Sequence, residues 1–421
     1  MNALTIALVC FLLLHLCVHN LALLLNARSA RLALPAEFQG IYDQREYISS
    51  QSYTRAKSRL EMLGSTMNTL VLVCLILLGG FAWLQATVTS LESPWLVQGL
   101  VFLGAMAALF EVLNLPLEIA SVFDLEERYG FNRTTAGTFI KDKVKTYVLL
   151  AILGSMAVCG IMLFFRAFPQ NGWLLAWAFM AALIFFLQYV GPSWILPLFN
   201  TFTPMEEGPL RDTILATAER AGFDLNEVFV MDGSKRSSKS NAFFTGLGRK
   251  KRIVLFDTLI NRHTSQELSA VLAHEIGHYK LRHIWRKTLF TLIQMGIMFY
   301  ILSLVLHSKP LYAAFGLSGT PLYAGLLFFA ILYTPVNLFL SLATNALSRR
   351  YEYEADEFAV RITKRPQDLS AALRRLARDN LSHLTPHWLY VLLEYSHPPV
   401  LDRLRHLREL QATLTETNEK G

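Results

Sequence analysis

The chain has 421 residues, of which 53% are hydrophobic and 17% charged, with a net charge of +7 and a mean hydropathy of +0.35. Soluble domains carry about 25% charged residues, so this composition indicates a membrane protein. The positive charge alone would be compatible with nucleic-acid binding, but Lys and Arg collect in particular connections, as membrane topology requires. We therefore expect a lipid bilayer as a partner and no nucleic acid.

Seven apolar segments are long enough to cross about 30 Å of hydrocarbon as helices, which takes roughly 20 residues. The first of them lacks a basic leader and is too long for the apolar part of a signal peptide, so we expect a retained helix. The segments are 3–25, 65–86, 95–118, 147–166, 173–194, 288–306 and 323–345.

The connections between these segments alternate in charge. Lys and Arg are frequent in 28–64, 119–146, 195–287 and 346–421, whereas the connection between the second and third spans has neither. The positive-inside rule then predicts that the N-terminus is outside and that the basic segments are cytoplasmic. An odd number of spans places the two termini on opposite sides, which agrees with this orientation.

Parts of the chain outside the spans are typical of soluble structure. NEVFVMDGSK (226–235) and KRIVLFDTLI (251–260) are rich in apolar and β-branched residues and predict two short strands. NAFFTGLGRK (241–250) predicts a strand followed by a turn. SQELSAVLAHEIGHYK (265–280) and PQDLSAALRRLARDN (366–380) have apolar residues at helical spacing and predict amphipathic helices.

These boundaries predict a polytopic α-helical membrane protein with seven transmembrane helices and an α+β soluble part. Residues 1–194 hold five spans and their loops, and 195–287 form a cytoplasmic segment with a short sheet and a helix. Residues 288–345 hold the last two spans, and 346–421 form a cytoplasmic C-terminal part.

The stretch VLAHEIGHYKLRH, residues 271–283, places His274 and His278 four residues apart. On a helix they lie one turn apart on one face, so two imidazoles can bind one tetrahedral Zn²⁺. Glu275 is rotated by about 100° and can reach a water on that metal, take its proton and deliver it to a leaving amine. Gly277 allows another element to approach the helix closely.

The five-residue pattern His-Glu-x-x-His is expected by chance in on the order of one in a hundred chains of this length. Surface histidines on an amphipathic helix are therefore the alternative to a metal site. The leftover His283, five residues past His278, would lie off the ligand face and has no assignment. A catalytic zinc also needs a third protein ligand and an open position for water.

The best candidates for completing the site lie in SRRYEYEADEFAV, residues 348–360. Glu352 can ligate the metal, and Asp356, one helical turn later, can accept a hydrogen bond from a ligand histidine. Glu354 and Glu357 fall elsewhere on that helix and are expected to be solvated. The alternative is that the whole stretch is a charged, solvated helix face.

Two further candidates lie near the C-terminus, in YSHPPVLDRL. In a zinc peptidase a His or Arg near the metal can stabilise the tetrahedral oxyanion, so His397 and Arg403 are possible participants. A free-standing histidine such as His397 can equally have a purely structural role.

Together these pieces resemble one family, the type I CaaX prenyl proteases, which are integral-membrane zinc endopeptidases. The resemblance covers nearly the whole chain and keeps its motifs in order around seven apolar segments. The motifs are ERYGFNRTT (127–135), PLFNTFTP (197–204), SKRSSKSNAFFTG (234–246), HEIGH (274–278), SRRYEYEAD (348–356) and SHPPVLDR (396–403).

The resemblance implies that His274, His278 and Glu352 ligate one Zn²⁺ and that Glu275 is the general base and acid. It also implies that Asn241 and His397 stabilise the oxyanion, while Arg403 holds the charge network of the site. The family stretch NAxFTG further serves as an edge strand to which substrate adds. The chain departs from the family at position 239, a lysine where eukaryotic members are expected to have histidine.

The family fold is a ring of seven tilted helices around a large water-filled chamber, capped by the zinc domain. Polar side chains within the spans fit such a chamber: His15 and His19 in the first, and Glu111, Asn114 and Glu118 in the third. A second metal site at the two histidines is the alternative to a chamber-facing or helix-packing role.

The implied activity is removal of the last three residues from isoprenylated proteins, with a peptide or protein substrate that is prenylated or otherwise membrane-associated. The compact chain with its short 6–7 connection suggests a bacterial inner-membrane protein with a cytoplasmic zinc site. A quality-control protease that cuts unprenylated membrane proteins would use the same residues. A transporter with an incidental motif would bind no zinc, and an intramembrane metalloprotease would carry the motif inside a span, which this chain does not.

Overall fold

The computed structural model describes residues 2–30, 33–225, 227–245 and 252–420. Within them, seven helices are long and apolar enough to cross a membrane, which confirms the predicted number of spans. The spans are α1 (Ala3–Arg28), α2 (Gln44–Leu77), α4 (Trp95–Ala120), α5 (Ala136–Ala167), α6 (Gly172–Val190), α11 (His283–Val305) and α13 (Leu322–Thr363).

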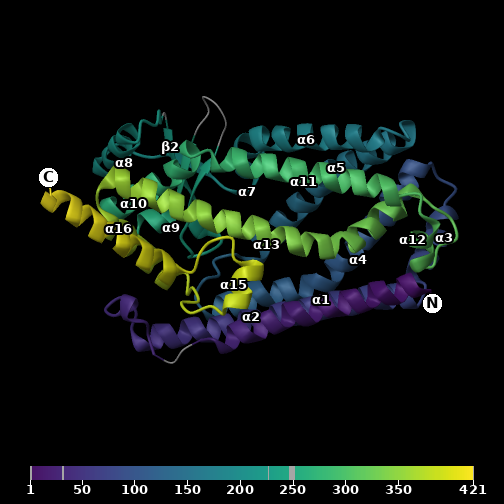
Figure 1. Ribbon diagram of the computed structural model, residues 1–421, viewed down its shortest axis with the longest axis horizontal. Coiled ribbons are helices and arrows are strands. Elements are labelled where there is room, and N and C mark those ends of the chain that lie inside the picture. Colours follow the sequence, from purple (N-terminus) through teal and green to yellow (C-terminus); the bar gives the residue numbers. More distant parts are fainter. Residues whose placement is uncertain (1, 31–32, 226, 246–251, 421) are drawn as a thin grey trace.

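The spanning helices form a ring. Each packs against the next in the order α1, α2, α4, α5, α6, α11, α13, and α13 returns to α1. Only 6–22% of the residues in their apolar windows are buried. A solidly packed bundle would bury a whole stripe of every helix, so these helices enclose an interior as well as facing outward. Figure 1 shows them lying along the long axis of the molecule.

Two of the spans end in π-helical turns, one beyond the predicted end at 118 and one at the predicted end at 194. After α4 comes η2 (Ser121–Glu126), and after α6 come η3 (Gly191–Ile195) and the short α7 (Leu196–Phe199). Such turns insert an extra residue into the helical repeat and often lie near functional sites. Here they carry α4 and α6 toward the soluble part of the chain.

The predicted span 65–86 is wrong at its end. Helix α2 stops at Leu77, and Gly79 adopts the left-handed conformation with φ of 74°. Glycine reaches this region without steric cost. The chain therefore breaks there and restarts as the separate helix α3 (Gly80–Thr89).

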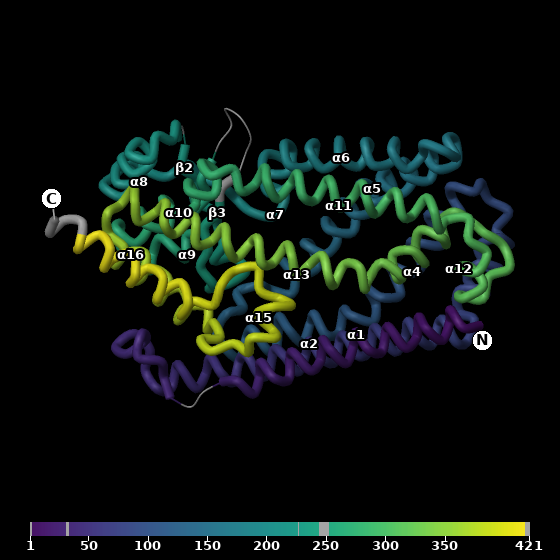
Figure 2. The backbone as a smooth tube through the Cα atoms, in the orientation of Figure 1, coloured from purple at the N-terminus to yellow at the C-terminus, as the bar shows by residue number. Residues whose placement is uncertain are grey.

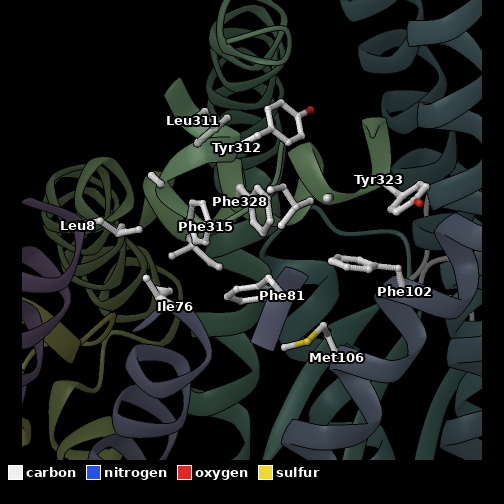
Figure 3. Packing of buried hydrophobic residues seen from close by; sticks show 14 of the residues in the cluster. Leu8, Ile76, Phe81, Phe102, Met106, Leu311, Tyr312, Phe315, Tyr323 and Phe328 are labelled. Carbon is white, nitrogen blue, oxygen red and sulfur yellow. The ribbon is translucent and has the colours of Figure 1, made fainter. Parts of the chain in front are cut away.

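An apolar cluster lies at the end of the ring near the N-terminus, and Figure 3 shows its packing from close by. Phe315 and Phe328 stack with ring centroids 3.9 Å apart, and Phe81 meets both rings edge-on at 5.5 and 5.3 Å. We call this cluster of buried apolar residues the aromatic plug. Its members are Leu8, Leu12, Val73, Ile76, Phe81, Val88, Phe102, Met106, Met162, Leu311, Tyr312, Ala314, Phe315, Leu317, Tyr323, Ala324, Phe328 and Ile331.

The soluble part lies at the opposite end of the ring, as the tube in Figure 2 shows. Its sheet has the strand order β1-β2-β4-β3, in which β2 and β4 are parallel and the two outer pairs antiparallel. The strands are β1 (Phe202–Pro204), β2 (Glu227–Met231), β3 (Ala242–Thr245) and β4 (Arg252–Phe256). The three predicted strands are confirmed, and the predicted turn 246–250 lies outside the described residues.

Helices cover this sheet and extend to the C-terminus. The amphipathic helices α10 (Ser265–Lys280) and α14 (Pro366–Asp379) form as predicted. Thr264 caps α10 in a capping box with Glu267, which fixes its first turn. The other helices at this end are α8 (Pro209–Arg220), α9 (Asp257–Ile260), α15 (Trp388–Glu394) and α16 (Val400–Lys420). Helix α12 (Lys309–Ala314) instead belongs to the aromatic plug at the opposite end of the ring.

One helix connects the ring with the soluble part. Helix α13 runs for 42 residues, so the last span and the predicted helix 348–360 are a single continuous element. Its C-terminal half buries Phe358 against Leu272 and Ile276 of α10 in the core of the soluble part. The rigid ring thereby sets the position of everything on that half of α13.

Candidate metal centre

The site is built where α10 and α13 cross. Gly277 of α10 faces α13 so closely that a Cβ added to it would lie 3.2 Å from the Ala355 Cα and 3.2 Å from the Phe358 Cβ. A glycine at this position lets the two helices approach within reach of a shared ligand. The sequence-based expectation for Gly277 is therefore confirmed.

Three side chains of the two helices converge at this crossing. The Nε2 atoms of His274 and His278 are 3.2 Å apart, and they lie 3.5 and 3.3 Å from the two carboxylate oxygens of Glu352. Atoms bound to zinc at about 2.0–2.1 Å in a tetrahedron stand about 3.3–3.4 Å from one another. Each imidazole nitrogen therefore lies about as far from the other, and from one carboxylate oxygen of Glu352, as ligands of one zinc ion do.

The burial of Glu352 supports the same conclusion. Its side chain is 2% exposed, and none of the described residues donates a well-aligned hydrogen bond to its Oε2, although nitrogens of His397 and Arg403 lie 2.9 and 3.4 Å away. An ionised carboxylate is costly to bury unless a cation compensates it. A metal ion at this point would satisfy that oxygen, so the residues present fit zinc. Within the described part of the chain, no other group of His, Cys, Asp and Glu side chains meets the criteria for a metal site.

Asp356 and Arg403 hold the back of the site. Asp356 Oδ1 lies 2.8 Å from Nδ1 of His274, the ring nitrogen that faces away from the ligand cluster. Arg403 donates to both Asp356 oxygens, at 2.8 Å from Nε and 2.6 Å from Nη2. Burial alone would lower the pKa of His274, but hydrogen bonds to Asp356 and Glu352 raise it to about 9 in the metal-free protein.

Arg403 carries the compensating charge. Its Nη1 lies 3.4 Å from Glu352 Oε2, and its side chain is only 10% exposed. Burial opposes its charge, yet the neighbouring carboxylate of Asp356 outweighs this and raises the pKa of Arg403 further. The guanidinium therefore stays charged and fixes both acidic side chains.

Glu275 lies next to the ligands on α10. Burial raises the pKa of its carboxyl above the ordinary value, opposed by the nearby His274 and His278. A raised pKa brings a carboxylate closer to the range in which it can both accept and return a proton.

His397 approaches the cluster from the loop before α16. Its Nδ1 lies 2.9 Å from Glu352 Oε2, and its side chain is 67% exposed. An imidazole that touches the buried ligand set while remaining open to solvent can reach a substrate. The structure thus brings His397, Arg403, Asp356 and the three candidate ligands into one place.

Asn241 has no described contact with the metal-site residues and lies at the start of β3. Phe256 N–H of β4 donates to its carbonyl at 3.1 Å, and its own Oδ1 accepts from Ala242 N–H at 2.9 Å. Strand β3 is an outer strand of the sheet and packs along α10. Asn241 is therefore placed at the sheet edge beside the helix that carries the histidines.

The segment before Asn241 is tied down by residues that sequence reasoning did not identify. The Asn380 side chain accepts from Ser240 N–H at 3.2 Å and donates to Ser240 O at 3.4 Å, as a neighbouring strand would. Lys239 donates to Glu126 at 2.8 Å and to the Tyr53 hydroxyl at 2.8 Å. Lys239, the residue where a histidine was expected from the family, therefore joins this segment to η2 and α2.

One sequence-based expectation is wrong, and one unassigned residue proves to be buried. Glu354 is not a freely solvated side chain, because its oxygens lie 3.1 Å from His283 Nε2 and accept from Arg350 Nε at 2.8 Å. His283, which had no assignment from the sequence, is 1% exposed, and its Nδ1 lies 3.0 Å from Nδ1 of His278. Glu357, by contrast, is 55% exposed and pairs with His406.

The polar side chains of the spans make contacts with one another. His19 Nδ1 lies 3.2 Å from Glu394 of α15, and the His15 and His19 rings are stacked with centroids 6.5 Å apart. The Asn114 and Asn68 amides pair reciprocally between α4 and α2. Lys143 of α5 pairs with both predicted acidic side chains of the third span, Glu111 and Glu118.

Comparison with known proteins identifies the family. A family profile described as CAAX prenyl protease N-terminal, five membrane helices, matches residues 24–201, and one described as peptidase family M48 matches residues 204–411. CAAX prenyl protease 1 of Saccharomyces cerevisiae is 33% identical over 89% of this chain and 88% of its own length. The homologue of Oryza sativa is 34% identical over 96% and 97%.

The human homologue is 32% identical over 90% of this chain and 89% of its own length. The crystal structure of S. mikatae Ste24p matches with a TM-score of 0.91 at 31% identity, covering 97% of this chain and 99% of that one. The predicted family resemblance and the seven-helix chamber fold are therefore confirmed. The chain belongs to the CAAX prenyl protease 1 family, zinc-dependent membrane endopeptidases of peptidase family M48.

Proposed function

We propose that this endopeptidase holds its zinc through Nε2 of His274, Nε2 of His278 and the carboxylate of Glu352. The observation that carries this assignment is the set of 3.2–3.5 Å separations among those atoms in a buried crossing of two helices. When bound there, zinc supplies a polarised water at neutral pH.

The surrounding residues then perform the proton transfers and hold charge. Glu275 accepts the proton of the attacking water and returns it to the leaving amine. Asp356 accepts the Nδ1 proton of His274 and so keeps Nε2 free to bind, while Arg403 holds Asp356 in place. His397 and Asn241 donate hydrogen bonds to the oxyanion that develops on the scissile carbonyl.

We place the substrate along β3. An outer strand presents unpaired backbone groups, so an extended peptide can add to it as a further strand. Asn241 at the start of β3 would then stand beside the peptide bond to be cut. The names of the relatives, CAAX prenyl protease 1, favour a C-terminally prenylated substrate. Cleavage of unprenylated membrane proteins is the second candidate, because the same residues would perform it.

We further propose that the zinc site faces the cytoplasm. The Lys- and Arg-rich segments 28–64, 119–146, 195–287 and 346–421 support this orientation through the positive-inside rule. The short connection between α11 and α13 supports a bacterial inner membrane. The relatives in the comparison are eukaryotic.

The test uses the full chain in lipid with three substrates: a farnesylated CaaX peptide, its unprenylated twin and an unfolded membrane protein. We expect the farnesylated peptide to be cut fastest, and Glu275→Gln to lower the rate about 10²–10⁴-fold while zinc is retained. Equal cleavage of the peptide twins would instead favour the quality-control function. Unchanged cleavage by Glu275→Gln would refute the proposed mechanism.

A further inference from the structure

Within the described residues, no carboxylate pairs with Nδ1 of His278 as Asp356 does with Nδ1 of His274. The Nδ1 of His274 lies 2.8 Å from Asp356, whereas the Nδ1 of His278 lies 3.0 Å from another imidazole, that of His283. A metal-bound histidine almost always donates its second ring N–H to a carboxylate, carbonyl or water, which fixes the orientation of its ring.

The proton positions follow from the geometry. If Nε2 of His278 faces the metal, its Nδ1 carries the hydrogen and donates to Nδ1 of His283. His283 must then carry its own hydrogen on Nε2, which lies 3.1 Å from Glu354 Oε2. Every donor in this series has an acceptor, and the series ends on a carboxylate.

The surroundings of His283 hold it rigidly in this arrangement. The side chain is 1% exposed, and its ring stacks on Tyr351 with centroids 4.2 Å apart and an interplanar angle of 8°. Glu354 is held in turn by Arg350 at 2.8 Å and Arg286 at 3.8 Å. Tyr351 and Glu354 flank the candidate ligand Glu352 on α13, so the same helix carries a ligand and the support for another.

The chain makes a sharp turn to place His283 here. Helix α10 ends at Lys280 and α11 begins at His283, with Arg282 in the left-handed region at φ of 59°. This conformation is uncommon for a residue with a side chain. It folds the start of α11 back, so that a residue only five positions past His278 contacts its ring.

We propose that His283 and Glu354 are positioning residues that form a hydrogen-bond relay, from His278 through His283 to Glu354, and hold the His278 ring in the orientation for zinc. This inference rests on the proposed ligand set. It gives the second histidine of the motif a carboxylate partner through one intervening imidazole, while the first has its carboxylate directly.

The test is a zinc titration of the metal-free full chain against a competing chelator. His283→Phe keeps an aromatic ring against Tyr351 but removes both hydrogen bonds, and Glu354→Leu removes the terminal acceptor. We expect each to weaken zinc binding by about 10–100-fold. Glu354→Gln, which keeps an acceptor oxygen, should weaken it less, and Glu357→Gln on the exposed face of α13 is the matched control.

Two readouts separate positioning from general destabilisation. The metal-free Glu354→Leu variant should remain folded and lose only the stability of the hydrogen bond to the buried His283, as its melting temperature will show, while its zinc affinity falls further than this loss accounts for. The visible spectrum of the Co²⁺-substituted variant should change. A variant with both His283→Phe and Glu354→Leu should have the zinc affinity of whichever single variant binds zinc less tightly. The two losses should not add, because both substitutions interrupt the same relay.

The relay is refuted if folded His283→Phe or Glu354→Leu binds zinc like the wild type, or if their losses add in the double variant. Should His283→Phe not fold, Glu354→Leu decides alone. His278→Ala separates this from the ligand assignment: loss of zinc there with full binding in Glu354→Leu refutes only the relay, whereas full zinc binding by His278→Ala refutes the proposed ligands.

Discussion

At the end of the ring near the N-terminus, Phe81, Phe315 and Phe328 are fully buried against one another. At the soluble end, Glu352 and Asp356 are buried to the same degree, but they carry charge. The aromatic plug gains its stability from contact with other apolar groups and needs nothing further. The buried carboxylates at the soluble end are stable only while each keeps its charged or hydrogen-bonding partner, since one unpaired buried charge is costly.

This difference shows how one chain can be both rigid and reactive. The aromatic plug joins α1, α2, α3, α4, α5, α12 and α13, and α13 continues from it to the proposed ligand Glu352. The ring end can therefore fix the geometry of the site without supplying any of its chemistry. The two ends should respond to substitution and to metal in separable ways.

Arg403→Met should have the largest effect at the charged end. It leaves Asp356 and Glu352 buried without their guanidinium, which should destabilise the protein by about 3–5 kcal/mol and weaken zinc binding. Denaturant unfolding with a chelator titration measures both. Arg405→Met is the control, because Arg405 is 60% exposed on the same helix. Wild-type stability of Arg403→Met would contradict this account.

Phe328→Ala should destabilise the aromatic plug by about 3 kcal/mol or more, through lost contacts and the cavity left behind. Zinc affinity of the folded protein should stay at the wild-type value, because no charged group of the site changes. Phe339→Ala is the control on the same helix, since Phe339 is 71% exposed. A loss of zinc affinity in Phe328→Ala equal to its loss of stability would show that the two ends are not separable.

Gly277→Ala should act at the crossing of α10 and α13. The new methyl group would press on the Ala355 backbone and cost about 1–3 kcal/mol, and zinc affinity should fall because the ligands move apart. Gly104→Ala in α4 is the matched control, since a Cβ there meets nothing within 4 Å and should slightly favour the helix. If both variants bind zinc equally, the close approach does not set the ligand spacing.

Arg282→Gly should have the smallest effect. The left-handed backbone at Arg282 costs an ordinary residue roughly 1–2 kcal/mol, and a glycine relieves this at some entropic cost. We expect a net change in the free energy of unfolding within about 1 kcal/mol and toward greater stability, with zinc binding unchanged. A clear loss of zinc affinity would assign the Arg282 side chain a part in the site.

The sequence predicted those features that depend on local patterns. Helical spacing predicted that His274 and His278 share a face and that Glu352 and Asp356 share another, and the strands followed from apolar β-branched runs. The break at Gly79 was missed because the apolar run continues through it, so hydropathy alone does not reveal a change of backbone conformation.

The missed residues of the site depend on the tertiary fold. His283 contacts His278 only because Arg282 adopts a left-handed turn, and a positive φ at arginine has no sequence signature. Asn380 pairs with Ser240 across 140 residues of chain, which no periodicity can indicate. The one signal in the sequence was a third histidine, His283, five positions after His278.

The zinc content of the purified full chain tests the central claim most directly, by comparing wild type with Glu352→Ala and Glu357→Ala. The two glutamates lie five positions apart on α13, the first buried beside both histidines and the second exposed. We predict one tightly bound zinc per chain in the wild type and in Glu357→Ala, and loss of that zinc in Glu352→Ala. A folded Glu352→Ala protein that binds zinc with wild-type stoichiometry and affinity would contradict the account.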